Sequence, residues 1–138
     1  MIDAEAAESG AWRPAVGLPG VELRLRGTDN LDWRRLNAKL IAQLPREKQL
    51  APALDPEDED AITGQLLHRT VLLDWRGFTT AAGAPDPYDP ARALALLTDP
   101  AYRRFRNSVL ATARILASET VAEREAAAKN SATGSPGS

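Results

Sequence analysis

Hydrophobic and charged residues alternate near the start of the chain. Residues 21–26 read VELRLR, and Gly27 ends the pattern. A period of two residues predicts a β-strand with one buried face. Because a lone strand leaves its backbone groups unpaired, we expect it to pair with the region of Trp12, with the region of Phe78 or with another chain.

After this strand the hydrophobic period changes to three or four residues. Residues 28–30 (TDN) are all good N-caps, and Pro45 marks the end of the pattern, since proline cannot continue a helical hydrogen-bond ladder. The spacing predicts an amphipathic helix between these points. Its apolar stripe consists of Trp33, Leu36, Leu40 and Leu44, with Ile41 beside it.

A second helix is predicted from Asp55 to about Asp74. Asp55 can cap it, Pro56 suits the first turn, and the acidic residues that follow complement the positive end of the helix dipole. We expect Gly77 to break this helix before a small hairpin or irregular loop. The apolar positions of this helix are Ile62, Leu66, Leu67, Val71 and Leu73.

Two Asp-Pro steps predict the starts of two more helices, at Asp89 and at Asp99. The first helix is short, and the second carries a long apolar stripe on one face. Beyond Glu119 large apolar residues become rare, and residues 130–138 (NSATGSPGS) are typical of a flexible tail. The stripe consists of Tyr102, Phe105, Val109, Ala113 and Leu116.

These patterns predict a mainly α fold: one small domain of about four helices, with one short N-terminal strand or hairpin and flexible termini. The domain is expected to span residues 21–128. Residues 1–20 are rich in Ala, Gly and Pro without a period, so we interpret them as a flexible arm, and residues 129–138 as a disordered tail.

Composition narrows the function classes. Hydrophobic residues make up 43% of the chain but aromatic residues only 5%, so we expect a modest core that a partner helps to complete. The net charge of -2 gives no overall attraction to nucleic acid or anionic membranes. The absence of cysteine excludes disulfides and thiolate metal sites, and no secretory signal or membrane-spanning run is recognisable.

No constellation of residues predicts catalysis, so we expect a protein that is not an enzyme and that holds no metal or cofactor. His68 is the only histidine and has no partner at a recognised spacing. The acidic run at 55–60 lacks the spacing of a calcium loop and is explained by the start of a helix. A glycine-rich phosphate loop is also missing.

Two groups of residues allow both a structural and a functional interpretation. The arginines at positions 103, 104 and 106 could contact nucleic acid, but their spacing favours the solvated face of an amphipathic helix. Trp75 beside Arg76 either closes a small core or anchors a protein interface, where both residue types are favoured.

Three segments in this order resemble tail assembly chaperones of long-tailed bacteriophages and prophages. They are WRRLNAKL at 33–40, VLLDWRGF at 71–78, and the Asp99-Pro100 helix with Tyr102 and Phe105. The resemblance covers about residues 21–130 and rests on order and spacing. It implies a small, mostly helical, non-enzymatic protein.

The resemblance further implies binding to the tail tape measure protein and recruitment of the tail tube protein. Self-association into a homo-oligomer, a location in the host bacterial cytoplasm and absence from the mature virion are also expected, without nucleic acid or membrane partners. Another phage structural component, such as a head–tail connector or tail completion protein, and a small DNA-binding regulator remain alternatives. The candidate partner-binding residues are Trp75, Arg76, Phe78, Tyr102 and Phe105.

Overall fold

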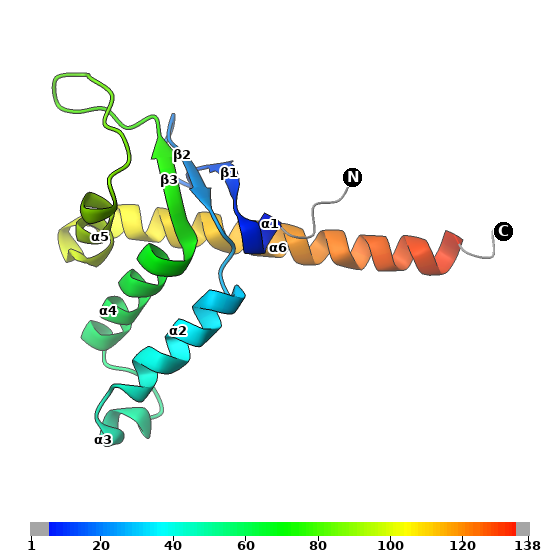
Figure 1. Cartoon of the computed structure of the whole chain (residues 1–138), viewed down its shortest axis with the longest axis horizontal. Coiled ribbons are helices and arrows are strands. Elements are labelled where there is room, and N and C mark those ends of the chain that lie inside the picture. Colours follow the sequence, from blue (N-terminus) through cyan, green and yellow to red (C-terminus); the bar gives the residue numbers. More distant parts are fainter. Residues whose placement is uncertain (1–5, 135–138) are drawn as a thin grey trace.

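The computed structural model describes residues 6–134, which form a mainly helical single small domain around a three-stranded sheet (Figure 1). In chain order the elements are α1 (Ala6–Ser9), β1 (Ala11–Pro14), β2 (Glu22–Leu25), α2 (Leu31–Ala42), α3 (Arg46–Gln49), α4 (Pro56–Leu66), the π-helical turn η1 (Leu67–Val71), β3 (Leu72–Arg76), α5 (Pro90–Thr98), the 3-10 turn η2 (Pro100–Tyr102) and α6 (Arg103–Gly134).

The predicted strand is the centre of the sheet. β2 pairs antiparallel with β1 on one side and with β3 on the other. Trp12 lies opposite Arg24 and Trp75 lies opposite Leu23, so the expected pairing with the region of Trp12 is confirmed. The second partner comes from just before Phe78 rather than from Phe78 itself.

The predicted flexible arm differs from the structure over residues 6–20. This segment forms α1 and β1 and the connection to β2, because β2 needs a neighbour for its backbone groups. Gly27 N–H also donates to Ala7 O at 2.8 Å, which ties α1 to the end of β2. Residues 1–5 of the predicted arm lie outside the described residues.

The helix predicted from Asp55 to about Asp74 is present up to Val71, and the prediction is wrong only for its last residues, 72–74. α4 ends at Leu66, η1 follows, and residues 72–76 form β3. The apolar run carried no signal that separated a continuing helix from a strand, since short apolar runs fit both. Residues 72–76 form a strand rather than more helix, because the strand buries Leu72 and Trp75 on one face and completes the sheet beside β2.

The four main predicted helices correspond to α2, α4, α5 and α6, and the structure adds the short helices α1 and α3. The cap predictions hold at Asn30, Asp89 and Asp99, where Asp99 Oδ1 accepts from Ala101 N–H at 2.9 Å, whereas the Asp55 side chain makes no cap bond. Asn30 Oδ1 accepts from Trp33 N–H at 2.8 Å, and Asp89 Oδ2 accepts from Arg92 N–H at 2.9 Å. Asn30 is itself buried and donates to Gly27 O and Thr70 O, which joins the start of α2 to η1.

The core lies between one face of the sheet and helix α6. Leu23 and Leu25 of β2 meet Val109, Ala113 and Leu116 of α6, and all five side chains are fully buried. In Figure 1 the second half of α6 runs past this layer and away from the body. The helix reaches Gly134, so the tail predicted from residue 129 is helical up to that point, and residues 135–138 lie outside the described residues.

Candidate functional site

Trp75 is the centre of an aromatic cluster inside the domain. Its ring stands edge-on to Phe78, Tyr88 and Phe105, with ring centroids 5.4, 4.9 and 5.8 Å away. Only 3% of Trp75 and 7% of Phe105 are exposed. Three of the five predicted partner-binding residues, Trp75, Phe78 and Phe105, are therefore brought together. Trp75 and Phe105 are buried in the core, so their rings are not available to a partner.

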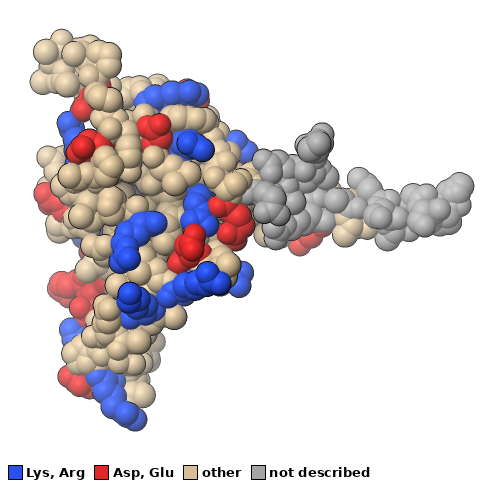
Figure 2. Space-filling view, viewed as in Figure 1, with Lys and Arg blue, Asp and Glu red and all other residues tan. Residues whose placement is uncertain are grey.

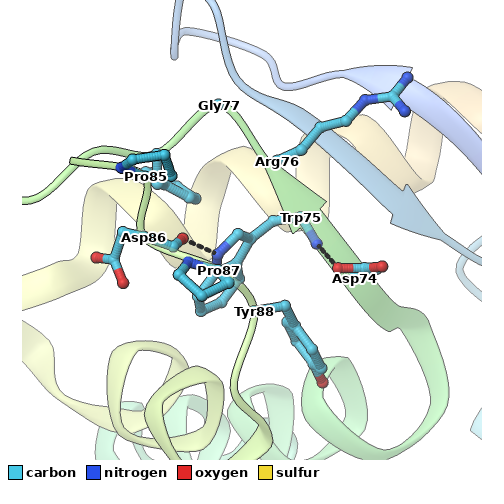
Figure 3. A pocket seen from close by; sticks show the side chains of 9 residues that line it. Asp74, Trp75, Arg76, Gly77, Pro85, Asp86, Pro87 and Tyr88 are labelled. Carbon is cyan, nitrogen blue, oxygen red and sulfur yellow. Dashed lines mark hydrogen bonds between the residues drawn. The ribbon is translucent and has the colours of Figure 1, made fainter.

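A hollow of about 440 Å³ lies beside this cluster, between β3 and the loop that precedes α5 (Figure 3). Trp75 Nε1 donates to Asp86 O at 2.9 Å, and the Asp86 carboxylate is paired with Arg92 at 2.8 Å. These bonds hold the loop against the strand. Besides Trp75 and Asp86, the hollow is lined by Asp74, Arg76, Gly77, Phe78, Pro85, Pro87 and Tyr88.

The phenol of Tyr88 titrates above its ordinary range. Burial disfavours its charged form and raises the pKa, and the carboxylates of Asp74 and Asp89 raise the pKa further. Tyr88 is therefore a neutral hydroxyl at physiological pH. This first hollow therefore combines aromatic rings with the carboxylates of Asp74 and Asp86 at its lining.

Arg76 points away from the hollow in Figure 3 and lies on the other face of the sheet. Its guanidinium lies 4.1 Å from the centre of the Trp12 ring and donates to Glu22 Oε1 at 3.0 Å. The hydrogen bond from Arg76 lowers the pKa of Glu22, and the same bond raises the pKa of Arg76. Arg76 therefore links β1, β2 and β3 and does not join the aromatic cluster.

Tyr102 belongs to η2 and is half exposed, so it does not continue the buried stripe of α6 as its spacing predicted. The arginines after it are engaged within the molecule. Arg103 and Arg106 both pair with Asp60, at 3.3 and 2.6 Å, and the hydrogen bond from Arg106 lowers the pKa of Asp60. Figure 2 shows acidic and basic side chains intermixed over the face it presents, without a broad basic field.

A second hollow, of about 430 Å³, lies between α4 and α5 and is named here the α4–α5 groove. Sequence reasoning missed this groove, because its walls are about 30 positions apart in the chain and neither wall carries a motif. The groove is lined by Glu57, Asp60, Ala61 and Gln65 of α4, by Leu94 and Thr98 of α5, and by Pro100.

Gly64 determines how closely the two walls approach. It is buried, and a Cβ atom at this position would lie 2.8 Å from Leu97 O and 3.0 Å from Thr98 Cγ2. A glycine is therefore required for α4 to pack directly on the end of α5. The only sequence signal for this contact is a glycine inside an otherwise helical run, which indicates close packing without naming the partner.

The acidic run at the start of α4 is partly neutralised. Lys48 pairs with Asp58 at 2.7 Å and with Asp55 at 3.5 Å, and the hydrogen bond to Asp58 raises the pKa of Lys48. Within residues 6–134, Glu57 and Glu59 take part in no ion pair. One end of the α4–α5 groove therefore carries uncompensated negative charge.

Other chemistry is sparse in the part of the chain that the structure describes. That part contains no group of three or more His, Asp or Glu side chains placed to hold a metal ion. None of its helices combines the length and apolar character that crossing a bilayer requires. His68 is half-buried on η1, and burial, with a smaller effect of Arg69, lowers its pKa.

Comparison with known proteins identifies a family. No curated protein and no solved structure matches this chain. The model of the YdaY prophage protein family matches residues 28–130, which run from the end of the β2 connection through most of α6. Since this match covers well over half of the sequence, the chain belongs to the YdaY prophage protein family.

Proposed function

We propose that this protein is a prophage tail assembly chaperone that acts without catalysis. It binds the tail tape measure protein, keeps that long helical molecule soluble and helps to recruit tail tube subunits in the host cytoplasm. Two lines of reasoning support this. The family is a prophage family, and its match over residues 28–130 coincides with the stretch, about 21–130, that resembles tail assembly chaperones.

The α4–α5 groove is the observation that carries the proposal. It is a surface hollow with an apolar lining between two helices, and its lining residues Ala61 and Leu94 are not among the buried core. A groove between helices is a common way to hold the apolar face of another helix. A tape measure protein consists largely of such helices, so the apolar face of one of its helices could pack in this groove.

Helix α6 supports self-association. Among the α6 residues whose burial the structure describes, the last core residue is Leu116, whereas Ile115 and Val121 are about half exposed. Most of the stability of a helix in a protein comes from packing of its apolar face, so a helix with exposed apolar residues gains stability from a partner. A homo-oligomer, or a client packed along α6, would provide that partner.

Co-expression tests the proposal. The tape measure protein from the same prophage is expressed in fragments, alone and with this chain, and the soluble fraction and the co-purifying protein are measured. We expect at least one fragment to become soluble and to co-purify. If every fragment stays insoluble and none is retained, the chaperone function is rejected.

The same material separates the alternatives. Detection of this chain in purified virions by mass spectrometry would favour a tail completion protein or a connector over a chaperone. Tight binding to double-stranded DNA at moderate salt in a gel-shift assay would favour a regulator. A chaperone is expected to give neither result.

A further inference from the structure

The edges of the sheet are closed to a strand-like ligand. Because Ala15 N–H donates to Val21 O at 2.9 Å, Trp12 and Pro14 turn their backbone groups to the free edge of β1. Pro14 has no N–H, and the Trp12 carbonyl already accepts from Arg13 at 2.9 Å. Proline on an edge strand is a known obstacle to further pairing.

The opposite edge is closed as well. On β3, Trp75 N–H donates to the Asp74 carboxylate at 2.7 Å, and the loop that precedes α5 lies beside the strand, held by Trp75 Nε1 (Figure 3). A partner that adds a strand to this sheet has no free row of donors and acceptors on either side. These bonds disfavour strand addition and direct attention to the helical surfaces of the domain.

The α4–α5 groove has the chemistry for one kind of helix. Ala61, Leu94 and Pro100 offer apolar surface, which takes aliphatic side chains. Glu57 at the rim lies in the first turn of α4 and has no cationic partner within residues 6–134. A cation on the ligand would complement this charge.

We propose that the α4–α5 groove binds an amphipathic helix that places an aliphatic anchor against Ala61 and Leu94 and a lysine or arginine beside Glu57. This inference rests on the proposed function, since it takes the helix to be a segment of the tape measure protein. It adds the docking surface and the charge of the client, and it assigns a role to the groove rather than to Trp75.

The test uses the full chain and overlapping synthetic peptides that cover the tape measure protein of the same prophage. Affinities are measured by fluorescence anisotropy, and helix formation is measured by circular dichroism. We expect the best-binding peptide to contain Lys or Arg next to aliphatic residues at helical spacing and to gain helicity on binding. A best-binding peptide that stays non-helical when bound would overturn the inference.

The first variant fills the groove. Ala61 is exposed within α4, so Ala61→Arg should fold normally and weaken peptide binding at least about tenfold, since an anchor of this kind contributes more than 1.4 kcal/mol. Ala38→Arg is the matched control, because Ala38 is equally exposed within α2 and lies outside the groove. It should bind as the natural chain does.

The second variant reverses the rim charge. Glu57→Lys should weaken binding about two- to fivefold, in the range of one exposed ion pair, and exchanging the peptide's cation for glutamate should restore it. Glu47→Lys is the matched control, since Glu47 occupies the first turn of α3 and is also exposed. No restoration with the exchanged peptide would contradict the charge assignment.

The outcomes distinguish the two levels of the proposal. If the natural chain binds no peptide and does not retain the tape measure protein, the proposed function fails. If the natural chain binds but folded Ala61→Arg binds equally well, the groove is not the docking surface and the chaperone function stands. Equal losses for Ala61→Arg and Ala38→Arg would also reject the groove, because the effect would then not depend on the site.

Discussion

Two hollows of this domain, the one beside Trp75 and the α4–α5 groove, have nearly equal volumes of about 440 Å³ and about 430 Å³, but their linings differ in kind. The first is floored by a buried tryptophan that packs against three other aromatic rings. The second is lined by partly exposed residues outside the core. Because hollows of similar volume can have such different linings, volume alone does not identify a binding surface. A surface whose residues are not needed for folding can change to suit a partner.

The largest effect is expected at Trp75. Trp75→Ala should destabilise the domain by about 3–5 kcal/mol, because it removes a buried aromatic side chain and leaves a cavity. Urea unfolding followed by circular dichroism measures this. Trp75→Phe keeps most of the packing and loses the bond to Asp86 O, so about 1 kcal/mol is expected. If Trp75→Ala has normal stability but fails to bind the client, Trp75 is an interface anchor, and the hollow beside it would be the binding surface.

A smaller effect is expected at Gly64. Gly64→Ala overpacks the contact with Leu97 and Thr98, which costs about 1–3 kcal/mol, while alanine improves helix propensity by up to about 1 kcal/mol. The net loss of stability should be about 1 kcal/mol, with weaker peptide binding because the groove walls move apart. Ala38→Gly should lose a similar free energy in α2 and leave peptide affinity unchanged. Unchanged affinity in Gly64→Ala would show that groove width is unimportant.

His68 lies on η1, the turn that joins the groove helix α4 to the strand of Trp75. Its folded-state pKa is below 6.5, so the unfolded chain takes up a proton first as the pH falls. Stability from this residue is complete above pH 6.5 and decreases as the pH falls through 6.5 toward the folded pKa. Urea midpoints at pH 7.5, 6.5 and 5.5 should decrease less for His68→Gln than for the natural chain. Parallel decreases would exclude His68 as the cause.

The smallest effect on stability is expected at the groove itself. Ala61→Arg should change the free energy of unfolding by less than about 0.5 kcal/mol, because the position is exposed and arginine is a good helix former. Thermal unfolding of this variant beside Trp75→Ala tests the comparison directly. A loss of several kcal/mol at Ala61 would place the groove among the structural hollows, like the one beside Trp75.

Local chemistry was enough to predict most starts of elements. The alternation at 21–26 identified β2, and Asn30 and Asp89 cap helices as their residue types predicted. The resemblance to prophage proteins was also readable from the chain, and the family match bears out its prophage part. The tail assembly role within that family stays a prediction.

Tertiary structure decided what the local signals left ambiguous. Residues 72–76 became a strand because β2 required a second neighbour, and residues 11–14 became a strand for the same reason on the other side. Neither segment has a period long enough to specify itself. The α4–α5 groove depends on Gly64, which lets α4 come into close contact with the end of α5 although residues 67–89 separate the two helices in the chain. Sequence periodicity determines which face of an element is apolar, but the partner of that face depends on the long-range packing of the whole chain.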